Sequence, residues 1–294
     1  MQNWAVIAGT LQQTLTMATP LLFTALGENV TQKSGVVNVG LEGVMLSGAF
    51  GATLIALQTG NPYLGVAAGA AVGVFSALIF AAFAVKLSAN QVVAGVVINL
   101  LALGLTGTIY RALFGKQGTA IQTHTLPHLL FEQNILTPIA LLAVPLIWVW
   151  LNRTRGGLEL RAIGEQPVAA EASGIKVLKL RTLAVLFGGA MAGVGGAFLS
   201  VGSSATFVPN MTDGRGFIAL AIVTSGRWNP FGCLIAALVF GFADALQYQQ
   251  QSMGLNVPKD LLLAAPYLAT LAILAFGSKK TFSPEALGKP YRKA

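Results

Sequence analysis

Long apolar stretches, each separated from the next by a short polar segment, run through the whole chain. Nine of them reach or approach the roughly 20 apolar residues that a membrane helix needs, at 5–26, 35–58, 63–85, 90–113, 135–152, 181–202, 213–226, 229–249 and 259–276. The pattern predicts an all-α integral membrane protein, a polytopic helical bundle of about nine (eight to ten) transmembrane spans. Residues 1–294 are then a single transmembrane domain.

Two of these stretches depart from the simple pattern. The second, 35–58, is interrupted by Asn38 and Glu42, and the seventh, 213–226, is short. Broken or re-entrant elements occur in membranes only where protein or a water-filled cavity covers their backbone. Either stretch is therefore a candidate for such an element.

Basic residues predict how the bundle is oriented. The loop 153–181 and the tail 277–294 are both rich in Lys and Arg, and four predicted spans separate them, so both lie on one side of the membrane. Basic loops face the cytoplasm, which places the C-terminus inside and the N-terminus outside. In this arrangement 14 basic residues are inside and four are outside.

Composition excludes several classes of protein. Only 10% of the residues are charged, against about 25% in soluble domains. The net charge of +8 comes from residues beside apolar stretches rather than from a patch interleaved with aromatics, so no nucleic-acid partner is predicted. A lone cysteine, Cys233, excludes an internal disulfide. Gly65, Gly69 and Gly73 recur every four residues, which is typical of closely packed membrane helices.

Sites for chemistry are not apparent in the sequence. We find no paired acids, no nucleophile with its base and no set of metal ligands, so we predict neither catalytic residues nor a metal site. The phosphate-binding pattern G-x-x-x-x-G-K-[ST] does not occur, so the chain has no ATP site of its own. A membrane-embedded enzyme is thereby disfavoured.

The basic loop contains a short helix of small residues. Pro167 stands where a helix would start and Gly174 where it would stop. The residues between them, VAAEAS, carry almost no bulk. Such a helix suits a groove on another protein. The alternative is an ordinary connection between spans, whose basic residues serve only to set the topology.

Polar and aromatic side chains within the apolar stretches are candidates for a solute path: Asn38, Glu42, Gln91, Asn99, Phe198 and Phe217. Ionisable groups in a bilayer are costly and point to a cavity, a partner or an interface. Glu42 and Asn38 lie one helical turn apart, so they could bind a polar solute or brace a broken helix. The amides at 91 and 99 could meet a nucleobase or bond to a neighbouring helix. The two aromatics could stack on a base or simply fill apolar space.

The run RAIGEQPVAAEASGI resembles the cytoplasmic coupling loop of the ABC-importer permease family that carries ribose-type sugars, branched-chain amino acids and nucleosides. Three further stretches resemble that family in the same order: TPLLFTALGENVTQKSGVVNVGLEGVMLSGAFGA, NQVVAGVVINLLALGLT and GRGFIALAIVTSGRWNPFGCLIAALVFGFADAL. The resemblance implies that one group of residues couples the chain to an ATPase subunit: Arg161, Gly164, Glu165, Pro167, Ala169, Ala170, Glu171 and Gly174.

Within the family, ALGENVTQKSGVVNVGLEG is most similar to the shorter permease of nucleoside importers. This resemblance implies a multi-pass subunit of the bacterial cytoplasmic membrane, which moves nucleosides inward with ATP and Mg bound by a separate ATPase. It also implies a second related permease, as a heterodimer or alternatively a homodimer, and an extracytoplasmic solute-binding protein. The rival hypotheses are a sugar or branched-chain amino-acid permease of the same family and an ion-coupled secondary transporter. The last is disfavoured because only Glu42 comes close to an ion-binding acid at mid-membrane.

Overall fold

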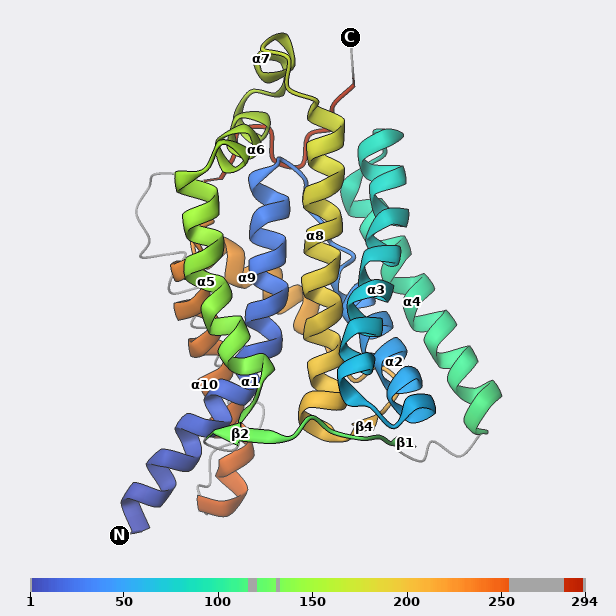
Figure 1. Cartoon of the computed structure of the whole chain (residues 1–294), viewed down its shortest axis with the longest axis vertical. Coiled ribbons are helices and arrows are strands. Elements are labelled where there is room, and N and C mark those ends of the chain that lie inside the picture. Colours follow the sequence, from blue (N-terminus) through green and yellow to red (C-terminus); the bar gives the residue numbers. More distant parts are fainter. Residues whose placement is uncertain (1, 116–120, 131–132, 254–282, 293–294) are drawn as a thin grey trace.

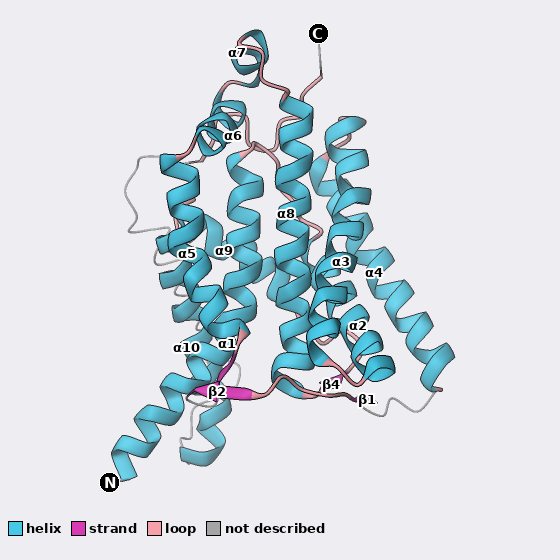
Figure 2. Cartoon of the chain, viewed as in Figure 1, coloured by secondary structure: helices cyan, strands magenta, loops and turns pink. Residues whose placement is uncertain are grey.

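The computed structural model describes residues 2–115, 121–130, 133–253 and 283–292, and most of this chain is helical (Figures 1 and 2). The helices are α1 (Gln2–Lys33), α2 (Leu41–Thr59), α3 (Pro62–Ala81), α4 (Gln91–Phe114), α5 (Leu136–Arg153), α6 (Arg155–Glu165), α7 (Pro167–Ala172), α8 (Val177–Ala197), α9 (Arg215–Ser225) and α10 (Pro230–Met253). Short π-helical turns, Ala82–Lys86 and Phe198–Ser204, extend α3 and α8.

The helices form one bundle around α1 and α8, which run side by side through its centre (Figure 1). Helices α2 and α3 pack on α8, and α4 lies outside α2, whereas α5, α9 and α10 pack on α1. Short strands cap one end: β1 (Ile121–Gln122) pairs with β4 (Thr206–Phe207), and β2 (His128–Leu130) pairs with β3 (Gln133–Asn134), both antiparallel. Helices α6 and α7 project from the opposite end, where the described part of the tail also lies (Figure 1).

Glycines allow α3 and α8 to approach almost backbone to backbone. A Cβ atom built on Gly73 would lie 2.2 Å from the carbonyl oxygen of Gly189, and one on Gly193 would lie 2.2 Å from that of Gly69. No side chain fits at such distances, so small residues are required here. The regular spacing of Gly65, Gly69 and Gly73 thus marks a real packing face.

Five of the described helices are long and apolar enough to cross a membrane: Leu41–Thr59, Pro62–Lys86, Gln91–Phe114, Leu136–Arg153 and Val177–Ser204. Two further apolar helices, Arg215–Ser225 and Pro230–Leu246, are shorter. The predicted stretch 5–26 lies within α1, and the predicted span 259–276 lies outside the described residues. A mostly helical membrane bundle therefore agrees with the sequence, while the count of about nine spans and the orientation of the termini remain predictions.

Two elements differ in detail from the sequence-based expectation. The second stretch becomes helical only at Leu41, so residues 34–40 form a non-helical segment between α1 and α2. The loop 153–181 is largely helical, because α6 precedes the expected short helix α7 and because α8 already begins at Val177. Helix α6 was not predicted. Its buried residues, Leu160 and Ile163 with Gly157 and Gly164, follow the spacing of an amphipathic helix.

We predict that Gly73→Ala lowers the melting temperature of the purified protein in detergent, measured by scanning fluorimetry. The new methyl group meets backbone atoms of α8, and overpacking of this kind costs about 1–3 kcal/mol. Gly104→Ala is the matched control, because a Cβ there meets nothing within 4 Å. A loss of stability in the control as large as that in the test variant would contradict the assigned packing face.

Candidate functional site

The carboxylate of Glu42 joins the starts of two helices that are far apart in sequence. Glu42 lies in the first turn of α2, and α9 begins at Arg215. Its Oε1 accepts a hydrogen bond from the backbone N–H of Gly214 (2.9 Å), and its Oε2 accepts one from the N–H of Gly216 (2.7 Å). The free N–H groups at a helix N-terminus and the helix dipole both favour an anion in this place. Glu42 therefore fixes where α9 starts relative to α2.

The backbone of α9 comes very close to Glu42. A Cβ on Gly216 would lie 2.3 Å from the backbone nitrogen of Glu42. Gly214 has a φ of +81°, in the left-handed region that glycine tolerates best. Both glycines in the sequence GRGF are thus needed for α9 to begin against α2.

Amide side chains fasten the non-helical segment between α1 and α2. Asn99 on α4 accepts a hydrogen bond from the N–H of Gly43 (2.8 Å) and donates one to the carbonyl of Val39 (3.0 Å). Gln91, at the start of α4, accepts one from the N–H of Val37 (2.8 Å). Asn38 itself accepts one from the N–H of Gly40 (3.0 Å). Backbone groups that a helix would have satisfied are thereby paired.

The two predicted aromatic residues lie in different surroundings. Phe198, in the π-helical turn after α8, is only 1% exposed and belongs to the hydrophobic core. Phe217, in the first turn of α9, is 47% exposed. The structure thus brings Asn38, Glu42 and Phe217 to the region where α2 and α9 begin. It does not bring Phe198 to an accessible surface of this chain.

A buried polar cluster at the end of α1 was not among the predicted site residues. Glu28 is fully buried, and its Oε1 accepts hydrogen bonds from Gln32 (2.9 Å) and from the N–H of Asn38 (3.0 Å). Gln32 in turn accepts one from the indole N–H of Trp228 (2.6 Å). The sequence did contain a signal, because Glu28 and Gln32 are four residues apart within an apolar helix.

The predicted coupling residues fall into buried and exposed groups. Pro167 is the first residue of α7, and Gly174 follows that helix with a φ of +86°. Ala169 is exposed, whereas Ala170 is buried, with 6% of its surface exposed. Arg161 has a buried Nε with no hydrogen-bond partner among the described residues. The free face of α7 is formed by its exposed residues, which are Val168 (71% exposed), Ala169 and Ala172.

The tail folds back over this loop and ties it to the bundle. The N–H of Ala286 donates to the carbonyl of Gly164 (2.9 Å), and the N–H of Glu285 donates to the Glu165 carboxylate (3.2 Å). The hydroxyl of Tyr291 donates to the carboxylate of Glu171 on α7. These contacts hold the predicted coupling residues against residues 285–291, which we call the tail clasp.

The tail clasp also contacts the first residues of the non-helical segment 34–40. The N–H of Gly288 donates to the carbonyl of Gly35 (3.1 Å). The guanidinium of Arg181 donates to the carbonyls of Ser34 (3.1 Å) and Lys289 (3.3 Å), and it lies over the Tyr291 ring, 5.7 Å from its centroid. A single buried cation therefore joins α8, the tail clasp and residues 34–35.

Two comparisons with known proteins agree with each other. The model of the family described as "Branched-chain amino acid transport system / permease component" matches residues 10–274. The putative glucose ABC transporter permease protein TsgC13 of Haloferax volcanii is 38% identical over an alignment 322 residues long, which covers 97% of this chain and 98% of that protein. The guanosine ABC transporter permease protein NupQ of Bacillus subtilis is 37% identical over 307 residues, which cover 95% of each chain.

A third similar protein is the nucleoside ABC transporter permease protein NupC of Lactococcus lactis. It is 34% identical over 303 residues, covering 95% of each chain. Bacillus subtilis also has a more distant relative, the guanosine ABC transporter permease protein NupP, which is 26% identical over 246 residues, or 78% of this chain and 71% of that protein. Two proteins named as guanosine permeases in one organism are thus similar to this chain.

We predict that Glu42→Leu destabilises the protein more than Glu42→Gln does. The Leu variant leaves two backbone N–H groups of the α9 start without their acceptor, at a cost of about 1–3 kcal/mol each. The Gln variant keeps one side-chain oxygen as an acceptor. Melting temperatures in detergent measure the difference, and Glu159→Leu, at an exposed acid on α6, is the control. Equal melting temperatures for the two Glu42 variants would contradict this role.

We predict that Tyr291→Phe loosens α7 without unfolding the bundle. The change keeps the ring and removes the hydroxyl that donates to Glu171, a bond to a charged group of the kind that contributes about 1.5–3 kcal/mol. Amide hydrogen exchange read by mass spectrometry should become faster in 167–172 and in 285–291. Tyr63→Phe, at an exposed residue of α3, is the control. Unchanged exchange at pH 8 would show that the tail clasp does not depend on this bond.

The same bond predicts a pH dependence. The hydrogen bond to Glu171 is the main cause that raises the pKa of Tyr291 above its usual value of 10.0. Because the folded-state pKa is raised, the contribution of the bond is complete below pH 10 and is lost as the pH rises through the raised value. The protection of α7 in the unmodified protein, which is the intrinsic amide exchange rate divided by the measured rate at the same pH, should therefore fall only above about pH 10. The Phe variant should show no such step.

Proposed function

This chain belongs to the permease-component family of branched-chain amino acid transport systems, and on that premise we propose that it carries nucleosides inward across the membrane. The family and the named relatives make it an ABC transporter permease subunit, a multi-pass membrane protein and a transport subunit rather than an enzyme. The solute, the direction and the partners are the parts that we propose.

The observation that carries the nucleoside proposal is the surface at the start of α9. Phe217 exposes almost half of its surface there, while the nearby Glu42 carboxylate is compensated by two backbone N–H groups. A nucleoside is neutral and has an aromatic face, so a path for it needs stacking surfaces and little uncompensated charge. We infer that Phe217 faces the solute, and that Asn38, Glu42, Gln91 and Asn99 shape the path by holding its backbone.

The named relatives support this assignment but also favour a second candidate. Two of the three most similar proteins described above are named for nucleosides or guanosine, and one is named for glucose. A sugar also has apolar faces that stack on aromatic rings, so glucose is the alternative solute.

The energy for transport comes, in this proposal, from a separate ATPase subunit that binds ATP and Mg. The short helix α7 would dock in a groove of that subunit through its exposed residues Val168, Ala169 and Ala172. The buried Ala170 would instead hold α7 on its own chain. Residues 153–181 and the tail then face the cytoplasm of a bacterial cell, and an extracytoplasmic binding protein delivers the solute at the other end.

We further propose that the complex contains a second, related permease. The pair of guanosine permease proteins in Bacillus subtilis supports a heterodimer over a homodimer. The solute path would then lie where the exposed face of α9 meets that partner.

The solute is tested by uptake of radiolabelled adenosine in cells that carry the complete transport system. We expect unlabelled guanosine to compete and unlabelled glucose and leucine not to. Phe217→Ala should raise the apparent KM for adenosine at least about fivefold, because stacking on an aromatic ring is worth about 1–3 kcal/mol per base. Phe231→Ala is the control, since Phe231 on α10 is similarly exposed, at 43%.

Three outcomes are informative. Competition by glucose but not by guanosine would assign the chain to sugar transport. An unchanged KM in Phe217→Ala would remove Phe217 from the path while leaving the nucleoside assignment to the competition data. Uptake that persists in Ala169→Trp, which adds bulk to the free face of α7, would mean that α7 does not couple the chain to the ATPase.

A further inference from the structure

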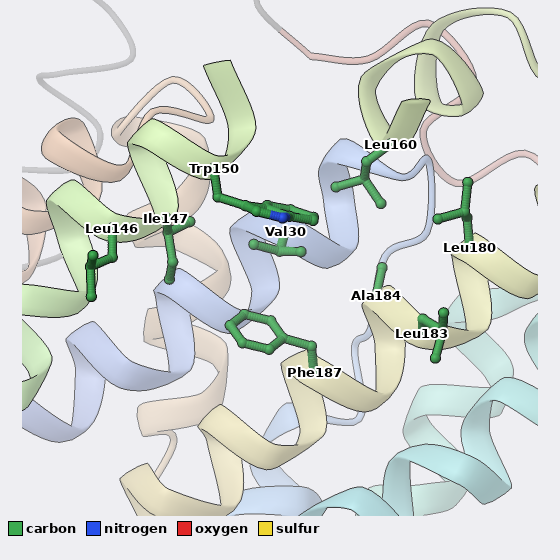
Figure 3. Close-up of a pocket in the computed structure, with 9 residues that line it drawn as sticks. All are labelled: Val30, Leu146, Ile147, Trp150, Leu160, Leu180, Leu183, Ala184 and Phe187. Atoms are coloured by element: carbon green, nitrogen blue, oxygen red, sulfur yellow. The ribbon is translucent and has the colours of Figure 1, made fainter. Parts of the chain in front are cut away.

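A groove on the side of the bundle has no role in the transport function described so far. It lies between α5 and α8, with α1 as its floor and Leu160 of α6 above it (Figure 3). Its volume is about 450 Å³, within the range of roughly 300–1,000 Å³ that is typical of small-molecule sites. The walls include Trp150 of α5 and both Leu183 and Phe187 of α8 (Figure 3).

The groove is apolar and accessible from the side of the helices. All nine lining residues are apolar or aromatic. Trp150, Leu183 and Phe187 are each 40–51% exposed. A hollow of this kind on the lateral surface of a membrane bundle is accessible to hydrocarbon chains rather than to water-soluble ligands. The occupant should therefore contain a flexible apolar chain.

Both walls continue into basic residues toward the end that carries α6 and α7. Arg153 lies three residues after Trp150 on α5, and Lys179 lies four residues before Leu183 on α8. Residues three or four apart share one face of a helix, so each wall ends in a cation. Lys176 stands in the same relation to Leu180, another lining residue.

These cations are available to a ligand. Arg153, Lys176 and Lys179 are exposed, and within the described part of the chain none of their side chains has a hydrogen bond or an ion pair. Two acids lie in the same region: Glu159 is exposed on α6, and Glu171 lines a surface hollow together with Lys176 and Lys179. Three cations against two acids leave the rim with an excess of positive charge. The indole N–H of Trp150 also donates to no described residue, and tryptophan is typical of the boundary between hydrocarbon and headgroups.

We propose that this groove binds an anionic phospholipid, with one acyl chain against Trp150, Leu183 and Phe187. Its phosphate then lies at the rim formed by Arg153, Lys176 and Lys179. The site and the lipid are complementary in charge. The apolar groove matches the acyl chain, and the cations, which lie only at the membrane boundary, match the single anionic headgroup. Basic pockets between membrane helices bind such headgroups. Binding of this lipid is independent of which solute the transporter carries.

The test is native mass spectrometry of the full-length chain in detergent, titrated with dioleoyl phosphatidylglycerol or with dioleoyl phosphatidylcholine. The acyl chains are identical, so only the headgroup differs. We expect one phosphatidylglycerol to be retained with at least about tenfold higher affinity, since each cation near a membrane surface is worth about 1 kcal/mol. Arg153→Gln, Lys176→Gln and Lys179→Gln should each weaken it about fivefold. Lys86→Gln, an exposed lysine at the end of α3, should not.

The groove itself is tested by filling it. Leu183→Trp should abolish retention of the bound lipid, whereas Leu103→Trp, at a similarly exposed residue of α4, should leave it unchanged. A photoreactive phenylalanine analogue at Phe187 should cross-link to phosphatidylglycerol. Equal affinity for the two lipids, retention in Leu183→Trp, or cross-links to residues 254–282 or to a second protein chain would each overturn the proposal.

Discussion

Residues 34–40 leave the helical pattern between α1 and α2, and a backbone buried in a membrane bundle has to find its hydrogen-bond partners within the protein. The polar side chains of the candidate site supply these hydrogen-bond partners. Asn38, Gln91 and Asn99 pair with N–H and carbonyl groups of residues 37–43 that have no partner within a helix. Glu42 then uses its carboxylate on the start of α9, where a second helix begins inside the bundle. The position of Phe217 follows from that contact, because it lies in the first turn of α9.

The sequence predicts the elements of this site better than it predicts their partners. Asn38, Glu42, Gln91 and Asn99 are conspicuous because they are polar within apolar stretches, and bracing was one of the two roles that they allowed. The partners are backbone N–H and carbonyl groups, which every residue has and which therefore leave no trace in the sequence. Gly214 and Gly216 follow Glu42 by more than 170 residues. Phe198 illustrates a different limit: the sequence of an apolar stretch does not show whether an aromatic side chain fills the hydrophobic core or faces a solute path.

In the predicted coupling region too, some features could be predicted from the sequence and others could not. Pro167 and Gly174 do delimit a short helix, as their local conformational preferences require. Burial could not be predicted, since Ala169 and Ala170 have identical side chains and yet one is exposed and the other buried. Helix α6 was missed because its hydrophobic spacing covers only 11 residues between charged ones. The tail clasp could not be predicted either, because Ala286 and Gly288 bind through their backbones.

The tail clasp and the polar framework are continuous with each other. The clasp holds α7 through Glu171 and holds residues 34–35 through Gly288 and Arg181. Residue 35 is the second residue of the non-helical segment, whose far end leads into Glu42. Hydrogen bonds of both side chains and backbone, through Tyr291, Arg181 and Glu42, thus connect α7 with the start of α9. In a family whose members are transport permeases, this gives residues 34–40 a reason to be non-helical. A helix would move as one rigid rod. In the proposed function, a segment that is fixed at both ends would instead pass a shift of the loop 153–181 to the residues that we propose shape the solute path.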